Sequence, residues 1–129
     1  EVVELARETL EFLGLTHVVD ELAGNLSGGQ KKLLEIGRTM MNDSKVVLLD
    51  EPGAGVNPTL MRKVADMIEQ LNQERGYTFC IIEHDMDMIA RLCGKVVVLA
   101  EGQVLMHGTM DEVRSDERVI DAYFGGEVV

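Results

Sequence analysis

Two short apolar runs on either side of an amphipathic segment place the strongest constraint on the fold of this chain. Val46–Leu49 is an unbroken apolar run, and Thr78–Ile82 is rich in β-branched and aromatic residues, so both are predicted strands. Between them, Asn57 followed by Pro58 is typical of a helix start, and Gly76 is placed to end that helix. This order predicts an α/β fold with a mostly parallel sheet, in which the first strand is buried on both faces.

Helices and a hairpin are predicted around this strand–helix–strand unit. Apolar residues at helical spacing predict a helix over residues 2–13, which Gly14 ends, and a second helix after Ser27. Three further elements are expected beyond the second strand: a short helix at about residues 85–92, a hairpin formed by residues 96–99 and 104–106, and a helical region from the capping pair Thr109 and Glu112 toward Tyr123.

Charge and composition exclude several classes of function. The 129 residues carry a formal net charge of −11 and no basic patch, so no nucleic-acid partner is expected. No apolar run approaches the length of a membrane span. The two cysteines, Cys80 and Cys93, do not suggest a disulfide framework, which favours a reduced, cytosolic setting. Cys80 lies inside a predicted strand and is expected to be buried.

The segment Leu26–Gln30, which reads Leu-Ser-Gly-Gly-Gln, is the sharpest candidate site. Ser27 and Gln30 have the spacing of a capping box, which is a purely structural interpretation. That interpretation does not explain Gly28 and Gly29, because each glycine within a helix costs about 1 kcal/mol relative to alanine. Glycines at a helix start expose backbone N–H groups and allow close approach, and the N-terminus of a helix favours anions. The segment therefore favours a phosphate site over a cap alone.

Two adjacent carboxylates, Asp50 and Glu51, follow the first predicted strand. Ligands of open parallel sheets bind at the carboxyl ends of the strands. Asp50 is accordingly a candidate Mg²⁺ ligand, usually through water, and Glu51 is a candidate base for an attacking water. An isolated Asp-Glu pair is better interpreted as a solvated strand end leading into a turn, so this assignment depends on the neighbouring motifs.

His84 follows the second predicted strand by two residues. Neighbouring parallel strands end at the same edge of a sheet, so His84 is a candidate to contact a terminal phosphate beside Glu51 and to fix the attacking water. Taken by itself, a histidine at this place is more often a capping or packing residue. His17 and His107 have no matching partners in the sequence and are expected to lie on the surface.

Together, these features resemble the ATP-binding cassette (ABC) family. Leu26–Gln30 matches the family signature sequence, Val46–Glu51 resembles the Walker B strand with its catalytic glutamate, and His84 matches the switch histidine. The resemblance covers the whole chain and implies a P-loop NTPase-like, mostly parallel sheet with flanking helices. It implies that residues 1–44 are part of the helical signature subdomain and that residues 45–129 are the C-terminal part of the ATPase core.

The resemblance also implies a composite site that two cassettes build together. The residues Ser27, Gly28, Gly29 and Gln30 would bind the ATP held by the opposite subunit. Asp50, with Mg²⁺, would act with Glu51 and His84 on the ATP of their own subunit. Asn57 is included in the ATP-binding set, although the family more often has aspartate there, so the hydrogen bonding is kept without the charge.

The implied partners are a second ATPase subunit and transmembrane permease subunits, which would hold the cytoplasmic chain at the inner face of the cell membrane. Three segments are similar to importers of branched-chain amino acids and related amides: 51–58, 82–86 and 119–125. The substrate assignment depends on this likeness alone, because separate subunits would handle the cargo.

The sequence departs from the family in one large respect, because it has no G-x-x-x-x-G-K-[ST] loop to hold ATP. The family has that loop upstream, so by motif order the chain corresponds to about half of a cassette. By itself it is expected to bind ATP weakly or not at all. Two alternatives remain open: an ABC-type DNA-repair or chromosome ATPase head, which the negative charge and short leading helix disfavour, and an inactive fragment.

Overall fold

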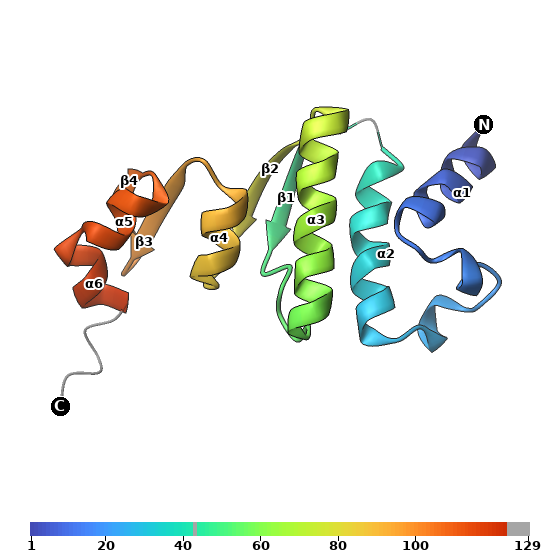
Figure 1. The fold of residues 1–129 in the computed structure, drawn as a ribbon, viewed down its shortest axis with the longest axis horizontal. Helices are drawn as coiled ribbons and strands as arrows, with labels where there is room; N and C mark the ends of the chain where they lie inside the picture. Colours follow the sequence, from blue (N-terminus) through green and yellow to red (C-terminus); the bar gives the residue numbers. More distant parts are fainter. Residues whose placement is uncertain (43, 124–129) are drawn as a thin grey trace. The chain divides into compact units, whose positions relative to one another are not determined.

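The computed structural model describes residues 1–42 and 44–123, which form two compact units (Figure 1). The first unit is Glu1–Glu83, and the second begins at His84. Each unit contains a two-stranded sheet, parallel in the first and antiparallel in the second. The predicted α/β class is confirmed. The predicted subdomain boundary between residues 44 and 45 stays a prediction.

The first unit is built from helices beside a parallel strand pair. Its elements are α1 (Val2–Phe12), two 3-10 turns (Thr16–Val18 and Ala23–Asn25), α2 (Gly28–Met40), β1 (Val46–Asp50), α3 (Pro58–Arg75) and β2 (Thr78–Ile82). The two strands pair from Val46 opposite Thr78 to Asp50 opposite Ile82, so both end at one edge. In Figure 1, α3 runs alongside the strands and α2 runs alongside α3.

The predicted ends of these helices are confirmed, and each has a local physical cause. Gly14 and Gly76 both have φ +68°, a left-handed conformation that glycine adopts without steric cost after a helix. At the start of α3, the Leu60 amide donates to Asn57 Oδ1 at 2.9 Å, and Pro58 occupies the first turn.

The strand β1 is buried on one face only, so the prediction of burial on both faces is wrong. Val47 is 5% exposed, whereas Val46 is 59% exposed and Leu48 is 76% exposed. On the same side as Leu48, Cys80 is exposed and Ile82 is 63% exposed, so the expected burial of Cys80 is also wrong. Alternate strand residues point to opposite faces, and nothing in residues 1–42 and 44–123 buries this second face.

Substitutions at neighbouring positions of β1 are therefore expected to differ in cost. Val47→Ala should lower the free energy of unfolding by about 1–3 kcal/mol, because it removes buried methyl groups. Leu48→Ala should change it by about 0.5 kcal/mol or less, because the side chain is already in water. Urea unfolding of the two variants measures the difference. Equal losses would contradict the one-sided burial.

The second unit is a hairpin with three short helices. Its elements are α4 (Met86–Leu92), β3 (Val96–Ala100), β4 (Gln103–Gly108), α5 (Met110–Ser115) and α6 (Glu117–Tyr123). Its core consists of Val98, Met110, Val113 and Val119. The predicted short helix and hairpin are confirmed. The turn between the strands places Glu101 at φ +51° and Gly102 at φ +75°, the left-handed pair that a two-residue hairpin turn requires.

The last two helices replace the single helical region predicted after Thr109, and Asp116 separates them. The predicted capping box at Thr109 and Glu112 is confirmed. Hydrogen bonds from the Thr109 amide and hydroxyl hold the pKa of Glu112 below its ordinary value. The box therefore stabilises the fold above the ordinary carboxyl pKa, and this contribution is lost as pH falls through the lowered pKa.

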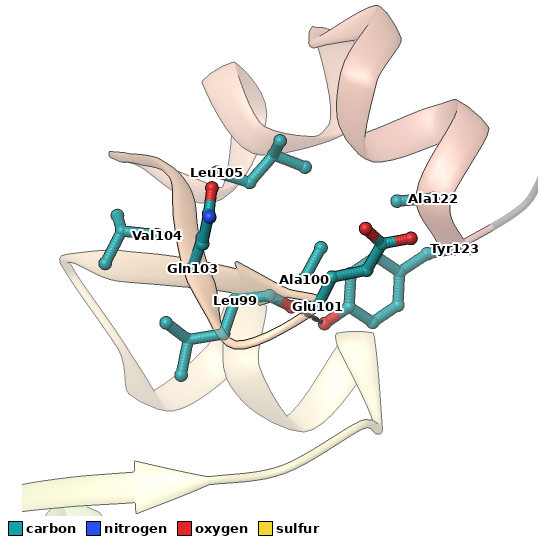
Figure 2. Close-up of a pocket in the computed structure, with 8 residues that line it drawn as sticks. All are labelled: Leu99, Ala100, Glu101, Gln103, Val104, Leu105, Ala122 and Tyr123. Carbon is teal, nitrogen blue, oxygen red and sulfur yellow. Dashed lines mark hydrogen bonds between the residues drawn. The ribbon is translucent and has the colours of Figure 1, made fainter.

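The end of α6 is attached to the hairpin. The Tyr123 hydroxyl donates to the Leu99 carbonyl at 2.6 Å, beside a shallow pocket that Glu101 and Ala122 also line (Figure 2). Phe124 and Gly125, which belong to the importer-like segment 119–125, lie outside the described residues. None of the helices that the structure describes combines the length and the apolar character needed to cross a bilayer.

Candidate functional site

The Ser27 segment forms the N-terminus of α2. The Ser27 hydroxyl accepts from the Gln30 amide at 3.2 Å, and Gln30 Oε1 accepts from the Ser27 amide at 2.8 Å. The predicted capping box is thus confirmed. Gln30 Nε2 also lies 3.4 Å from His17 Nε2. Both ends of the Gln30 amide are therefore engaged within the first unit, whereas Ser27 and Gly28 are exposed at the helix tip.

The two glycines of this segment differ in what they are needed for. A Cβ at Gly29 would lie 2.6 Å from Leu60 Cδ2, so this glycine lets α2 pack closely against the first turn of α3. A Cβ at Gly28 would meet nothing within 4 Å, and its φ is not positive. Packing within the chain therefore gives no reason for glycine at position 28. Glycine at this position leaves the backbone of the helix tip open to close approach by a group from outside.

A groove of about 690 Å³ lies between the first turns of α2 and α3. Its lining includes Ser27, Gly29 and Gln30 from the first helix, and Asn57 and Lys63 from the second. Two helix N-termini with their partial positive charge thus face one groove beside a lysine, which favours an anion. The structure brings Ser27, Gly29 and Gln30 of the predicted signature segment together with Asn57, although α2 and β1 separate them in the sequence.

Lys63 was not predicted as a site residue. Its ammonium group donates to the Leu13 carbonyl at 3.2 Å, which attaches α3 to the end of α1, while its side chain lines the groove. Helical spacing from the cap at Asn57 places Lys63 less than two turns into α3. That spacing could have indicated Lys63 as a site residue, but only with the knowledge that the N-termini of α2 and α3 share a groove.

Asp50 and Glu51 lie at the carboxyl end of β1, as predicted. The Glu51 amide donates to the Ile82 carbonyl at 2.8 Å, which extends the pairing of the two strands by one residue. Glu51 has φ +46°, a left-handed conformation that costs a residue other than glycine about 1–3 kcal/mol. Its exposed side chain is therefore held in an unusual direction by the turn that follows.

Asp50 lines a cavity of about 220 Å³ on the side of α2, together with Lys32, Glu35 and Thr39. Within residues 1–42 and 44–123, no three His, Cys, Asp or Glu side chains group together as ligands for a metal ion. Mg²⁺ in nucleotide sites is commonly bound by one or two carboxylates together with phosphates and waters. Asp50 fits that mode, but only with a nucleotide supplying further ligands.

A third acidic residue at this edge of the sheet, Glu83, is not among the predicted site residues. The Gly53 amide, in the turn after β1, donates to Glu83 Oε1 at 2.8 Å, and Glu83 is half-buried. The signal that could have found Glu83 is its place one residue beyond β2. There a side chain can reach the turn of the neighbouring parallel strand.

His84 is the first residue of the second unit. It follows Glu83 directly in the chain and is exposed. Its predicted role beside Glu51 stays a prediction.

Two family models match parts of the chain. The model described as "ABC transporter" matches residues 2–54, which include the α2 segment and the carboxylates after β1. The model described as "Branched-chain amino acid ATP-binding cassette transporter" matches residues 103–129.

Relatives and solved structures match nearly the whole chain. The "Probable branched-chain amino acid transport ATP-binding protein LivG" of Archaeoglobus fulgidus is 40% identical over 98% of this chain and 49% of its own length. The "High-affinity branched-chain amino acid transport ATP-binding protein BraF" of Pseudomonas aeruginosa is 38% identical over 97% of this chain and 49% of its own. A crystal structure of the ADP conformation of an ATP-binding cassette matches with a TM-score of 0.87 and 41% identity, over 97% of this chain and 50% of that one. The chain thus spans about half the length of the relatives it matches.

Proposed function

Because the chain belongs to the ABC transporter ATPases and spans about half of a cassette, we propose that it is the C-terminal part of an ATP-hydrolysing transport subunit. The subunit would energise import of branched-chain amino acids or related amides. This substrate is supported by the names of the relatives and by the family model that matches residues 103–129.

The observation that carries the proposal is the groove between α2 and α3. It combines two helix N-termini and the exposed Ser27 hydroxyl. Gly28, the next residue at the tip of α2, does not line the groove, and a Cβ at this position would meet nothing within 4 Å. Such an arrangement suits a phosphate that approaches from outside. We assign to the groove the terminal phosphate of an ATP bound by a second cassette. Ser27, Gly28 and Gly29 would face that phosphate, and Asn57 would border it.

The strand end of β1 would act on the nucleotide of its own subunit. Glu51, exposed at the carboxyl end of a parallel strand, is the group that would orient and deprotonate water. Asp50 would bind Mg²⁺ together with ATP phosphates, and the ion would neutralise charge on those phosphates. His84 would donate to the terminal phosphate. The partners proposed are a second ATPase subunit and membrane permeases, which would place the subunit at the inner face of the membrane.

Gly28→Ala tests the N-terminal tip of α2, because this substitution separates an effect on folding from an effect on function. In this chain, the substitution should leave the free energy of unfolding unchanged or raise it by up to about 1 kcal/mol, since alanine is the better helix former and meets no neighbour. In the complete cassette that contains this chain, the added methyl group should lower ATP hydrolysis about tenfold or more, because it blocks backbone donors. Urea unfolding and a phosphate-release assay give the two values.

Gly94→Ala is the matched control. A Cβ at Gly94 would also meet nothing within 4 Å, and this glycine belongs to the second unit rather than to the Ser27 segment. The control should leave hydrolysis unchanged. Full hydrolysis by the Gly28 variant would contradict phosphate binding at the tip of α2, and with it the proposed composite site.

A further inference from the structure

The turn that follows β1 is attached to the end of β2 at two points. The Glu51 amide donates to the Ile82 carbonyl at 2.8 Å. Two residues further, the Gly53 amide donates to Glu83 Oε1, also at 2.8 Å. Within the turn, the Ala54 amide donates to the Glu51 carbonyl at 3.0 Å. The backbone is thus attached to the end of β2 at Glu51 itself and again two residues later at Gly53.

The turn packs closely around Gly53. A Cβ at this position would collide with the methyl group of Met61 on α3 and would lie 2.8 Å from Glu83 Oε1. Pro52, on the other side of the amide, is buried. The absence of a side chain at position 53 therefore allows the Glu83 carboxylate to approach the Gly53 amide with Met61 packed beside it.

We propose that Glu83 is a positioning residue for the hydrolysis assigned to Glu51, an inference that rests on the proposed function. Glu51 has φ +46°, a conformation that persists only where the surrounding structure maintains it. By holding the turn, Glu83 fixes the direction in which the Glu51 side chain leaves the backbone.

The reach of the Glu83 side chain, rather than its charge, is the property this role requires. Glu83→Gln keeps an oxygen at the same distance from the backbone and removes the charge. Glu83→Asp keeps the charge and shortens the side chain by one methylene group, so it cannot reach the Gly53 amide from the same backbone position. A positioning role predicts that Gln preserves function and Asp loses it, whereas a purely electrostatic role predicts the reverse.

The first measurement is amide hydrogen exchange at Gly53 in this chain. Glu83→Asp and Glu83→Ala should raise the exchange rate of this amide about tenfold or more, because its acceptor is lost. Glu83→Gln should keep its protection. Glu74→Gln is the control, since Glu74 is an exposed residue of α3 whose carboxylate accepts from Gln70, one turn earlier, at 3.0 Å. An unchanged rate in the Asp and Ala variants would overturn the bond itself.

The second measurement is ATP hydrolysis by the complete cassette. Glu83→Asp should lower kcat by on the order of 10–10²-fold with little change in KM for ATP, because misplacement of a reacting group slows the chemical step and leaves substrate binding in place. Glu83→Gln should restore kcat. A normal kcat in the Asp variant, or a low kcat in the Gln variant, would overturn the positioning role.

The two measurements separate this inference from the proposed function. If Glu51→Gln left hydrolysis intact, the proposed function of Glu51 would fail, whatever Gly53 exchange showed. If Glu51→Gln abolished hydrolysis while the Glu83 variants had no effect on kcat, only the role of Glu83 would fail. If the Ala variant did not fold, the Asp and Gln pair would still give both readouts.

Discussion

Glu51→Gln is expected to lower ATP hydrolysis by the complete cassette on the order of 10²–10⁴-fold while ATP binding persists. The amide cannot take a proton from the attacking water, yet it has the size and shape of the carboxylate. The substitution should hardly change folding, because the Glu51 side chain is exposed and its backbone amide keeps the bond to Ile82. Single-turnover hydrolysis and equilibrium binding of ATP measure the two quantities separately.

Glu101→Gln is the matched control for this variant. Glu101 is also an exposed glutamate with positive φ, at +51°, but it lies in the hairpin turn of the second unit. Any general effect of exchanging a carboxylate for an amide in a strained turn should appear in both variants, whereas the loss of hydrolysis should appear only at position 51. Near-normal turnover in the Glu51 variant would exclude this residue as the base.

Ser27→Asp should abolish the proposed contribution of the α2 N-terminus to ATP hydrolysis while keeping the helix intact. Aspartate is about as good an N-cap as serine, so the free energy of unfolding of this chain should change by less than about 0.5 kcal/mol. A carboxylate at the proposed phosphate position should lower hydrolysis on the order of 10²-fold, because two negative charges a few ångströms apart repel each other.

The composite arrangement makes this variant informative in mixed dimers. One Ser27→Asp subunit paired with one unchanged subunit should lose hydrolysis at the ATP bound by the unchanged subunit. Thr109→Asp in a Glu112→Gln background is the control, since this pair gives the capping box of the second unit the same neutral partner that Ser27 has in Gln30. Full turnover at the unchanged subunit's site would contradict recognition across subunits.

The features that could be predicted from the sequence are those with local causes. The capping box at Ser27, the cap at Asn57 and the glycines that end α1 and α3 each depend on a few neighbouring residues, and all are confirmed. The strand at Val46–Leu49 was predicted correctly for the same reason. The burial of this strand was not predicted correctly. A run of apolar residues shows that both faces of a strand can be covered, and it does not show that both are covered in this chain.

The candidate site was only partly predictable because its geometry depends on packing. Gly29 was singled out for a possible ligand, but it also serves the contact with Leu60, which the sequence could not show. The approach of α2 to α3 brings Asn57 and Lys63 to the signature segment. Glu83 escaped notice because its partner, Gly53, is 30 residues away and becomes a neighbour only through the parallel register of the strands.

The uncovered face of the parallel strand pair has a consequence for how free energy is divided between folding and association. Val46, Leu48 and Ile82 add little to the stability of this chain, because their side chains remain in water. A polypeptide that covers them would gain roughly 25 cal/mol for each square ångström of apolar surface removed from solvent. That gain would be measured as affinity, and by mass action it would also raise the chain's apparent resistance to unfolding as the concentration of the covering polypeptide rises.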